Sequence, residues 1–457
     1  MVISGVGQAD DTALISNNLH NLQYLLLLSQ IFCKKYSVKI CAEKTKLQVF
    51  STKNTDESAL YSMMTNPLTI DDKQIEFVET AEHVGIVRAT SGNLPAILSR
   101  LSSHKKALGA VLHTGVARGH RGNPAASLRV VKVYGAPVLL SGLATLVLSS
   151  AEETIIDQHY KAVISNVQRL HPGTPRSVIY FLAGSLPGIA LLHLRRLSIF
   201  GMVCRLQQNI LHTHALNYFS SGTGTLSNHS WFHQIRELCL QYLLPHPLDL
   251  LRSQYSKESY KRLVKKNVID YWEKLLRSEA VGLDSLHLFS SSFCSLTSPH
   301  PMWTTAGSSP AKIAMCTVQG QMISGRYRTE LLCSKWSKNK SGVCLLSTDC
   351  STTPEDILHI LQACPALEPT RIMLRSFTDD YCRKFPEAKE FTTILTAPTS
   401  PESFSRWLLD CSSFPSVISA VQLNGPTILD HLYNISRTWV YTLYRKRLQI
   451  LGRWNLL

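Results

Sequence analysis

Segments with apolar residues at helical spacing dominate the middle of the chain, and this pattern limits the possible fold more than any other feature. Residues 94–113, 152–170 and 189–207 each carry an apolar stripe with basic residues opposite it. Because residues three and four positions apart share one face of an α-helix, each segment is predicted to be an amphipathic helix packed on a core. Residues 256–278 form a further, strongly charged helix of this kind. These segments predict a mainly helical protein.

The first 90 residues follow another pattern, in which short apolar runs alternate with turns. β-Branched and apolar residues predict strands at residues 2–6, 37–41, 47–51, 75–78 and 82–87. Residues 19–35 have apolar side chains at helical spacing and predict one helix among these strands. The fold class expected is therefore α+β and predominantly helical.

The charge of the chain points to a class of partner. Lys and Arg outnumber Asp and Glu by 47 to 32, a formal charge of +15, and such an excess favours polyanions, of which nucleic acid is the commonest. The alternative is a merely basic protein. The start, MVISGVGQADD, lacks the basic and apolar regions of a signal peptide. We expect an intracellular protein, in the nucleus or cytoplasm, that is not secreted and has no membrane partner.

An acidic pair lies near the start, in the segment Gly7-Gln8-Ala9-Asp10-Asp11. Two adjacent carboxylates in a turn after an apolar strand present hard oxygen ligands at one place, which suits Mg²⁺. Magnesium ions in such a site can activate an attacking hydroxyl and stabilise a leaving pyrophosphate. The alternatives are a solvated turn and a helix N-cap, in which Asp11 would begin a helix over residues 12–17.

The order of segments after this pair resembles the end of the palm of non-LTR retrotransposon reverse transcriptases. In that family an Ala-Asp-Asp turn is followed by a helix, a Glu-Lys-Thr-Lys-like segment and a Gly-containing hairpin, and this chain has Glu43-Lys44-Thr45-Lys46 and Val84-Gly85-Ile86. The resemblance implies that Asp10 is a metal ligand beside Asp11, that Lys44 assists the leaving pyrophosphate, and that Val84, Gly85 and Ile86 form the primer grip. Lys44 as a solvated lysine and Gly85 as an ordinary turn glycine are the alternatives.

Two departures from the family pattern limit what this resemblance implies. Gln8 replaces the usual aromatic residue, and the family's other metal aspartate belongs to a strand upstream of the chain's first residue. The sequence is thus interpreted as the C-terminal portion of an RNA-directed DNA polymerase, truncated before the Ala-Asp-Asp motif. We expect that this chain alone does not polymerise, and that Mg²⁺ would bind only in a completed site.

Three cysteines and a histidine form a second group, with the spacing Cys344-x5-Cys350-x8-His359-x4-Cys364. Three thiolates and one imidazole are a common tetrahedral ligand set for Zn²⁺. A helix is predicted over residues 351–361, with Thr353 as its N-cap. The alternative is three buried free thiols and a core histidine.

The neighbouring sequence resembles the C-terminal Cys-Cys-His-Cys region of the same family. The matching segments are residues 322–330, Cys333-x-x-Trp336 and Ile357-Leu358-His359-x4-Cys364-Pro365. The resemblance implies a small Zn²⁺-stabilised unit that contacts nucleic acid, with Cys333 as a spare ligand if Cys344 is not used. A further helix is predicted over residues 315–336.

Basic residues recur in three helical segments and are the candidate contacts for RNA and DNA. Each alternates with apolar or aromatic residues, a pattern shared by phosphate-binding helices and by ordinary solvated helices. The candidates are Arg195, Arg196, Lys261, Arg262, Lys265, Lys266, Arg445, Lys446 and Arg447.

These observations divide the sequence into five segments. They are a partial palm (1–90), a helical thumb-like region (91–245), a basic helix with a Ser/Pro-rich linker (246–312), a zinc-binding-like region (313–370) and a C-terminal helical region (371–457). The leading interpretation is a remnant of a non-LTR reverse transcriptase. The alternatives are a non-enzymatic nucleic-acid-binding protein that uses the basic helices and the zinc unit, and a helical scaffold.

Overall fold

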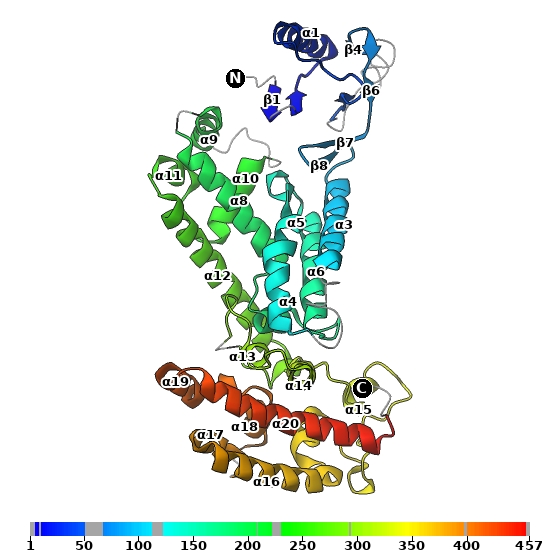
Figure 1. Cartoon of the computed structure of the whole chain (residues 1–457), viewed down its shortest axis with the longest axis vertical. Helices are drawn as coiled ribbons and strands as arrows, with labels where there is room; N and C mark the ends of the chain where they lie inside the picture. Colours follow the sequence, from blue (N-terminus) through cyan, green and yellow to red (C-terminus); the bar gives the residue numbers. More distant parts are fainter. Residues whose placement is uncertain are drawn as a thin grey trace. The chain divides into compact units, whose positions relative to one another are not determined.

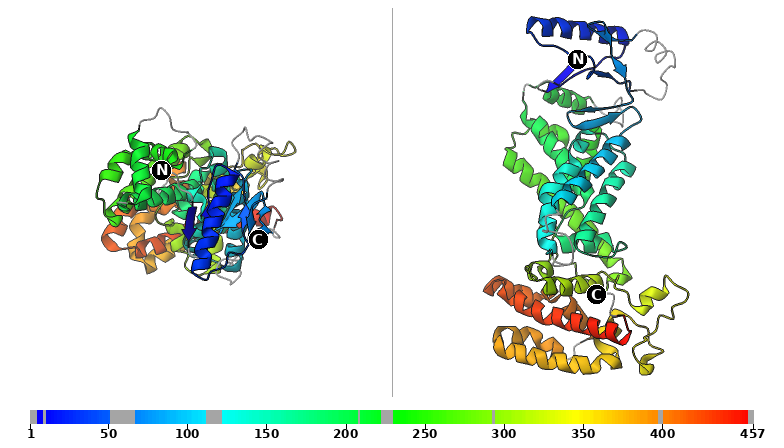
Figure 2. Two further views of the ribbon diagram at one scale, coloured as in Figure 1. Left: turned by 90° about the horizontal axis from the view of Figure 1, so that it is seen from above. Right: turned by 45° about the vertical axis from the view of Figure 1, so that its right-hand side comes forward.

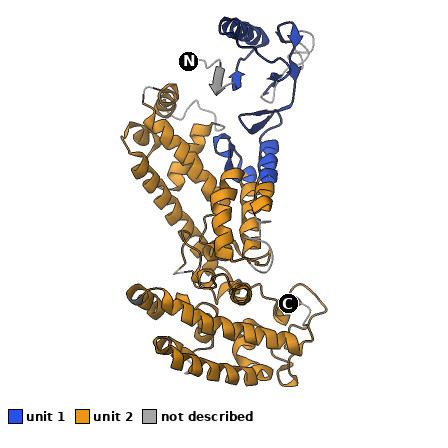
Figure 3. Ribbon diagram, in the orientation of Figure 1, with its two compact units in different colours: residues 1–103, 139–152 blue, residues 104–138, 153–457 orange. Residues whose placement is uncertain are grey.

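The computed structural model describes residues 5–8, 11–50, 67–111, 122–207, 209–221, 230–291, 294–396 and 400–453 (Figure 1). Helices predominate, and every strand of the described chain lies before residue 90. This confirms the expectation of a predominantly helical protein. The chain divides into two compact units, shown in Figure 3: residues 1–103 with 139–152, and residues 104–138 with 153–457.

Unit 1 begins with two hairpin strands and a helix. Strand β1 (Gly5–Gln8) pairs antiparallel with β2 (Asp11–Leu14), with Gln8 opposite Asp11. Helix α1 (Leu19–Lys35) starts at Asn18, whose side chain accepts a hydrogen bond from the Asn21 N–H at 2.8 Å. Because β2 begins at Asp11, this residue is not the cap of a helix over residues 12–17, and that alternative is wrong.

Short strand pairs complete the β-structure of unit 1. Strand β3 (Lys46–Leu47) pairs parallel with β6 (Glu76–Phe77), and antiparallel pairs join β4 (Thr69–Ile70) to β5 (Lys73–Gln74) and β7 (Thr80–His83) to β8 (Ile86–Ala89). A small core of Leu26, Ala42, Leu68, Ile70 and Ile75 lies among them. The strand predicted at residues 37–41 is absent, and the one predicted at 47–51 is reduced to β3 within its described part.

Unit 2 is built from helices, and α3, α5 and α6 each have residues in both units. The helices are α3 (Leu94–Val111), α4 (Pro124–Val130), α5 (Ala136–Leu140), α6 (Ser150–Val167), α7 (Arg176–Ala183), α8 (Gly188–Arg205), α9 (Ile210–Ser220), α10 (Trp231–Gln241), α11 (Pro247–Arg252), α12 (Lys257–Val281), α13 (Pro301–Thr304), α14 (Pro310–Ile323), α15 (Glu330–Ser334), α16 (Glu368–Lys384), α17 (Lys389–Thr396), α18 (Pro401–Leu409), α19 (Pro415–Asn424) and α20 (Thr427–Ile450). A π-helical turn, Val131–Gly135, joins α4 to α5.

Close packing fixes the long basic helix α12 against α8. A Cβ atom at Gly201 of α8 would overlap the Tyr260 ring of α12, so only glycine permits this approach. The Tyr260 hydroxyl donates to the Leu197 carbonyl at 2.9 Å, and the Trp272 indole donates to the Tyr242 hydroxyl at 3.0 Å. The apolar face of α12 is therefore buried, which leaves its charged face exposed.

Helix α20 is the centre of the C-terminal part of unit 2 and lies beside α16 in both Figure 1 and Figure 2. The buried Trp439 of α20 donates to the Thr378 hydroxyl of α16 at 2.8 Å. The helix predicted over residues 315–336 is broken into α14 and α15. Gly325 lies at the break with φ +62°, where a Cβ atom would overlap the Ser285 carbonyl oxygen.

The described helices were also compared with the requirements for crossing a membrane. No single one of them has both the length and the apolar composition needed, whereas α7 and α8, bent by 63° at the break between them, reach those limits as a pair.

Candidate metal centre

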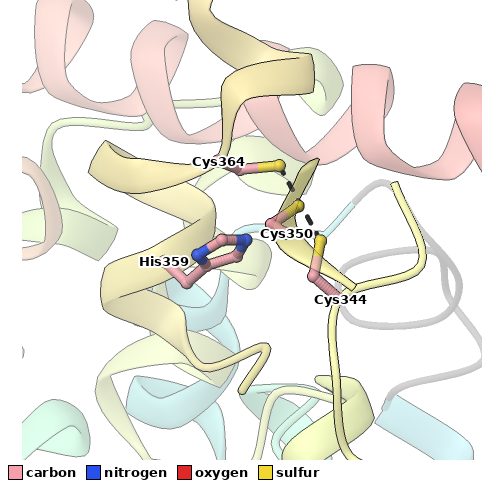
Figure 4. A group of neighbouring side chains, drawn as sticks. All are labelled: Cys344, Cys350, His359 and Cys364. Atoms are coloured by element: carbon pink, nitrogen blue, oxygen red, sulfur yellow. Dashed lines mark hydrogen bonds between the residues drawn. The ribbon is translucent and has the colours of Figure 1, made fainter. Parts of the chain in front are cut away.

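The four residues singled out as zinc ligands lie together in the structure (Figure 4). Cys344, Cys350, His359 and Cys364 are all buried, and their potential ligand atoms lie within 4.8 Å of one another. Among the described residues this is the only group of three or more His, Cys, Asp or Glu side chains that could hold a metal ion. Cys333, the predicted spare ligand, does not belong to the group.

The first ligand is positioned by a short β-bridge between Val343 and Pro354. The Cys344 N–H donates to the Thr353 carbonyl at 2.9 Å, and the Glu355 N–H donates to the Gly342 carbonyl at 3.0 Å. This bridge corrects the predicted helix over residues 351–361, because residues 351–353 form a turn and a bend, Pro354 belongs to the bridge, and Thr353 caps no helix.

His359 is the first residue of a π-helical turn, His359–Ala363, and Cys364 directly follows this turn. Asp356 precedes this turn, and its carboxylate accepts a hydrogen bond from the His359 N–H at 2.7 Å. The Cys364 N–H donates to the His359 carbonyl at 2.8 Å, a bond that spans five residues. A π-turn is wider than an α-turn and is frequent at functional sites. Here it brings the side chains of residues 359 and 364 to the same cluster.

The distances within the cluster fit a tetrahedral metal. The Cys344 and Cys364 sulfur atoms are 3.8 Å apart, far longer than a disulfide bond of about 2.05 Å. Two thiolates bound to Zn²⁺ at about 2.3 Å with a tetrahedral angle lie about 3.8 Å apart. Both ring nitrogens of His359 are buried with no hydrogen-bond partner among the described residues. A buried imidazole without partners costs free energy, and a bound metal would satisfy one of its nitrogens.

Burial favours the uncharged forms of the residues in this cluster. It lowers the pKa of His359, which keeps the imidazole neutral, although Asp356 and Glu355 oppose the shift. It raises the pKa of Cys344 to about 12, so this thiol stays protonated unless a cation replaces its proton. The Leu346 N–H donates to the Cys344 sulfur at 3.4 Å, a contact that stabilises a thiolate.

Buried charged residues form hydrogen bonds and an ion pair next to the cluster. Arg371 donates to the Cys364 carbonyl at 2.5 Å, and Arg447 of α20 pairs with Glu355, which is fully buried. Arg447 also donates to the Tyr327 hydroxyl at 3.2 Å and is itself 2% exposed. The prediction that Arg447 contacts nucleic acid is therefore wrong, because its guanidinium is enclosed in the protein.

Arg196 requires the same correction. It is 1% exposed and forms an ion pair with Glu153, which also contacts His193 at 3.3 Å. The other basic candidates lie at the surface: Arg195, Lys261, Arg262, Lys265, Lys266 and Arg445 are exposed, and Lys446 is partly exposed. The exposed basic face of α12 thus holds four of the predicted contacts.

The predicted polymerase residues do not form a metal site in the described part of the chain. Asp10 lies outside the described residues, Asp11 is exposed at the start of β2, and Lys44 is exposed in a turn. Val84 and Gly85 form the two-residue turn between β7 and β8, and Ile86 begins β8. The hairpin is present, while its role as a primer grip stays a prediction.

The sequence did not predict a ring stack between His171 and Trp336. The ring centroids are 5.7 Å apart and the planes are inclined by 14°. Trp336 appeared only as part of the Cys333-x-x-Trp336 segment, and no local pattern could link it to a histidine far earlier in the chain.

Comparison with known proteins gave no match for this chain among family models, curated proteins or solved structures.

Proposed function

We propose that this chain is a nucleic-acid-binding protein of non-LTR reverse-transcriptase ancestry, with a C-terminal unit stabilised by Zn²⁺. The observation that carries the proposal is the convergence of Cys344, Cys350, His359 and Cys364. These are the four positions at which the sequence resembles the Cys-Cys-His-Cys region of that family.

Zinc is the metal that best suits this ligand set. Three sulfur atoms and one nitrogen are soft ligands, which select Zn²⁺ over Mg²⁺ or Ca²⁺. All four ligands come from the protein, as in structural zinc sites, whereas catalytic sites keep one position for water or substrate. The expected role of the metal is to hold the bridge around Val343 and the turn His359–Ala363 in place.

The exposed charge of unit 2 supports nucleic acid as the partner. Helix α12 buries Tyr260, Val264, Val268 and Trp272, and it exposes Lys261, Arg262, Lys265 and Lys266. These cations form two adjacent pairs, at residues 261–262 and 265–266, that lie one helical turn apart, so they can neutralise phosphates spaced along one strand.

Zinc content and stability test the metal part of this proposal. We expect one zinc per purified chain by elemental analysis. Removing it with a chelator should destabilise unit 2 by on the order of 5 kcal/mol, since structural zinc binding contributes about 10–16 kcal/mol in finger peptides. Cys350→Ser should lose the metal, and the matched control Cys333→Ser should keep it. A metal-free chain whose thermal unfolding is unaffected by chelator would overturn the proposal.

A second candidate function is RNA-directed DNA polymerisation. Two features of unit 1 favour descent from such a polymerase. Strands β1 and β2 pair with Gln8 opposite Asp11, and the hairpin β7–β8 follows helix α1 in the order that the resemblance implies. We propose that the chain alone is inactive, because Asp11 belongs to no described group able to hold a metal. Mg²⁺ would then bind only in a completed polymerase site.

Primer extension tests this second proposal. The purified chain with Mg²⁺, an RNA template and a DNA primer should incorporate no nucleotide. Incorporation that disappears in Asp10→Asn would show an active site and contradict the proposal of inactivity.

A further inference from the structure

An aromatic ring stack lies on the surface of unit 2, in the segment that leads to the zinc ligands. Trp336 follows helix α15 and is 52% exposed, although it stacks on His171 from the segment between α6 and α7. The His171 Nδ1 accepts a hydrogen bond from the Gly173 N–H at 3.0 Å. This bond fixes the histidine ring, and the stack in turn fixes the orientation of the half-exposed indole.

Positive charge surrounds the stack. Burial lowers the pKa of His171, and the positive charges of Arg328 and Arg326 lower it further. Arg328 is exposed, and the Nε of Arg326 is buried without a hydrogen-bond partner among the described residues. The lysines on either side of Trp336, Lys335 and Lys338, are exposed as well.

The nearest acidic side chain in the sequence does not cancel this charge. Glu330 is 1% exposed and is shared by Lys340 at 3.1 Å and Arg453 at 3.2 Å. Its carboxylate is thus neutralised by two cations that are separate from those around the stack. Glu330 therefore does not pair with Arg328, Lys335 or Lys338.

We propose that the Trp336–His171 stack is a base-stacking platform for single-stranded nucleic acid, with Arg328, Lys335 and Lys338 holding the adjacent phosphates. The inference rests on the proposed nucleic-acid binding. It adds that the bound nucleic acid is single-stranded and that it binds at this stack. An indole held in one orientation can stack on an unpaired base of any identity, while cations beside it bind the backbone. Bases in a duplex are already stacked on one another and cannot use the platform.

Binding of labelled oligonucleotides to the full chain, measured by fluorescence anisotropy, tests this inference. The probes are a 12-nucleotide RNA, the DNA of the same sequence and the DNA duplex. Trp336→Ala should weaken binding to both single strands by roughly 5- to 100-fold, the range expected for one lost stacked base. Binding to the duplex should change less than about threefold, and the salt dependence should stay the same because no charge is removed.

Two further variants separate stacking from a purely structural role. Trp336→Phe keeps an aromatic ring and should retain most of the single-strand affinity. Tyr134→Ala removes another exposed aromatic ring of unit 2 and should have no effect. Unchanged single-strand binding by Trp336→Ala, or equal losses on single strands and duplex, would overturn the platform and leave the proposed function standing. If the wild-type chain binds none of the probes, the proposed function itself fails.

Discussion

Two arginines in the last helix, Arg445 and Arg447, have opposite environments although only one residue separates them. Both were predicted to contact phosphates from the basic sequence around them. Arg445 is exposed, whereas Arg447 faces inward and pairs with the buried Glu355. Adjacent positions in a helix point about 100° apart, so a run of basic residues cannot all share the surface.

Replacing Arg447 should therefore affect stability and not phosphate binding. Arg447→Met leaves the Glu355 carboxylate buried without its cation, which should cost about 3–5 kcal/mol in the free energy of unfolding. Arg445→Met is the matched control and should change stability by less than about 0.5 kcal/mol. Urea denaturation measures both. Equal effects of the two variants would contradict the buried ion pair, and adding Glu355→Gln to Arg447→Met should recover part of the loss.

Among the secondary-structure elements, the hairpin β7–β8 contains an unfavourable residue at its turn. Val84 has φ +53° and Gly85 has φ +70°, so both turn residues have left-handed backbone conformations. Glycine adopts this conformation without strain, but a β-branched residue does so at a cost. A two-residue turn with both φ values positive favours Asn-Gly over Val-Gly.

Val84→Asn should consequently stabilise the hairpin, by about 1 kcal/mol, because asparagine tolerates the left-handed region. Amide hydrogen exchange of the paired residues 80–83 and 86–89 reports this change directly. Gly85→Ala is the control and should destabilise the hairpin, since a residue with a Cβ atom is strained at φ +70°. A slower exchange in Gly85→Ala than in the wild type would show that the turn has another conformation.

For the whole molecule, the positive charge that a partner can contact depends on which cations are exposed and which are paired. The formal charge is +15, but some cations are buried in ion pairs and others are paired with surface carboxylates. In α16, for example, Arg375 pairs with Glu368 and Arg383 pairs with Asp380. The basic face of α12 presents four exposed cations within two helical turns.

The salt dependence of nucleic-acid binding tests the importance of this face. Replacing Lys261, Arg262, Lys265 and Lys266 together by Gln should lower the slope of log affinity against log salt by about 3, because each phosphate contact contributes about 0.7–0.9. A control variant carries Gln at four other exposed cations, Arg375, Arg383, Lys384 and Lys389, and should keep most of the slope. A slope that falls equally in both variants would show that the protein binds by its net charge and not through α12.

Several elements could be predicted from the sequence because the relevant information is local. The apolar stripes predicted helices that the structure contains as α6, α8 and α12. The strand predicted over residues 82–87 was wrong, because Val84 and Gly85 turn the chain between β7 and β8, although the resemblance implied a hairpin there. The helix predicted over residues 315–336 was wrong in extent. Its break at Gly325 is required by the Ser285 carbonyl, which packs there from a distant segment.

The sequence by itself determined the predominance of helix, the excess of positive charge and the candidate group of three cysteines and one histidine. Each of these depends on residue type and short-range spacing. Only the tertiary structure decided which cations are exposed, that Cys333 is outside the cluster, and that His171 stacks on Trp336. These features depend on contacts between segments far apart in the chain. Burial and pairing arise from those contacts and have no local signature.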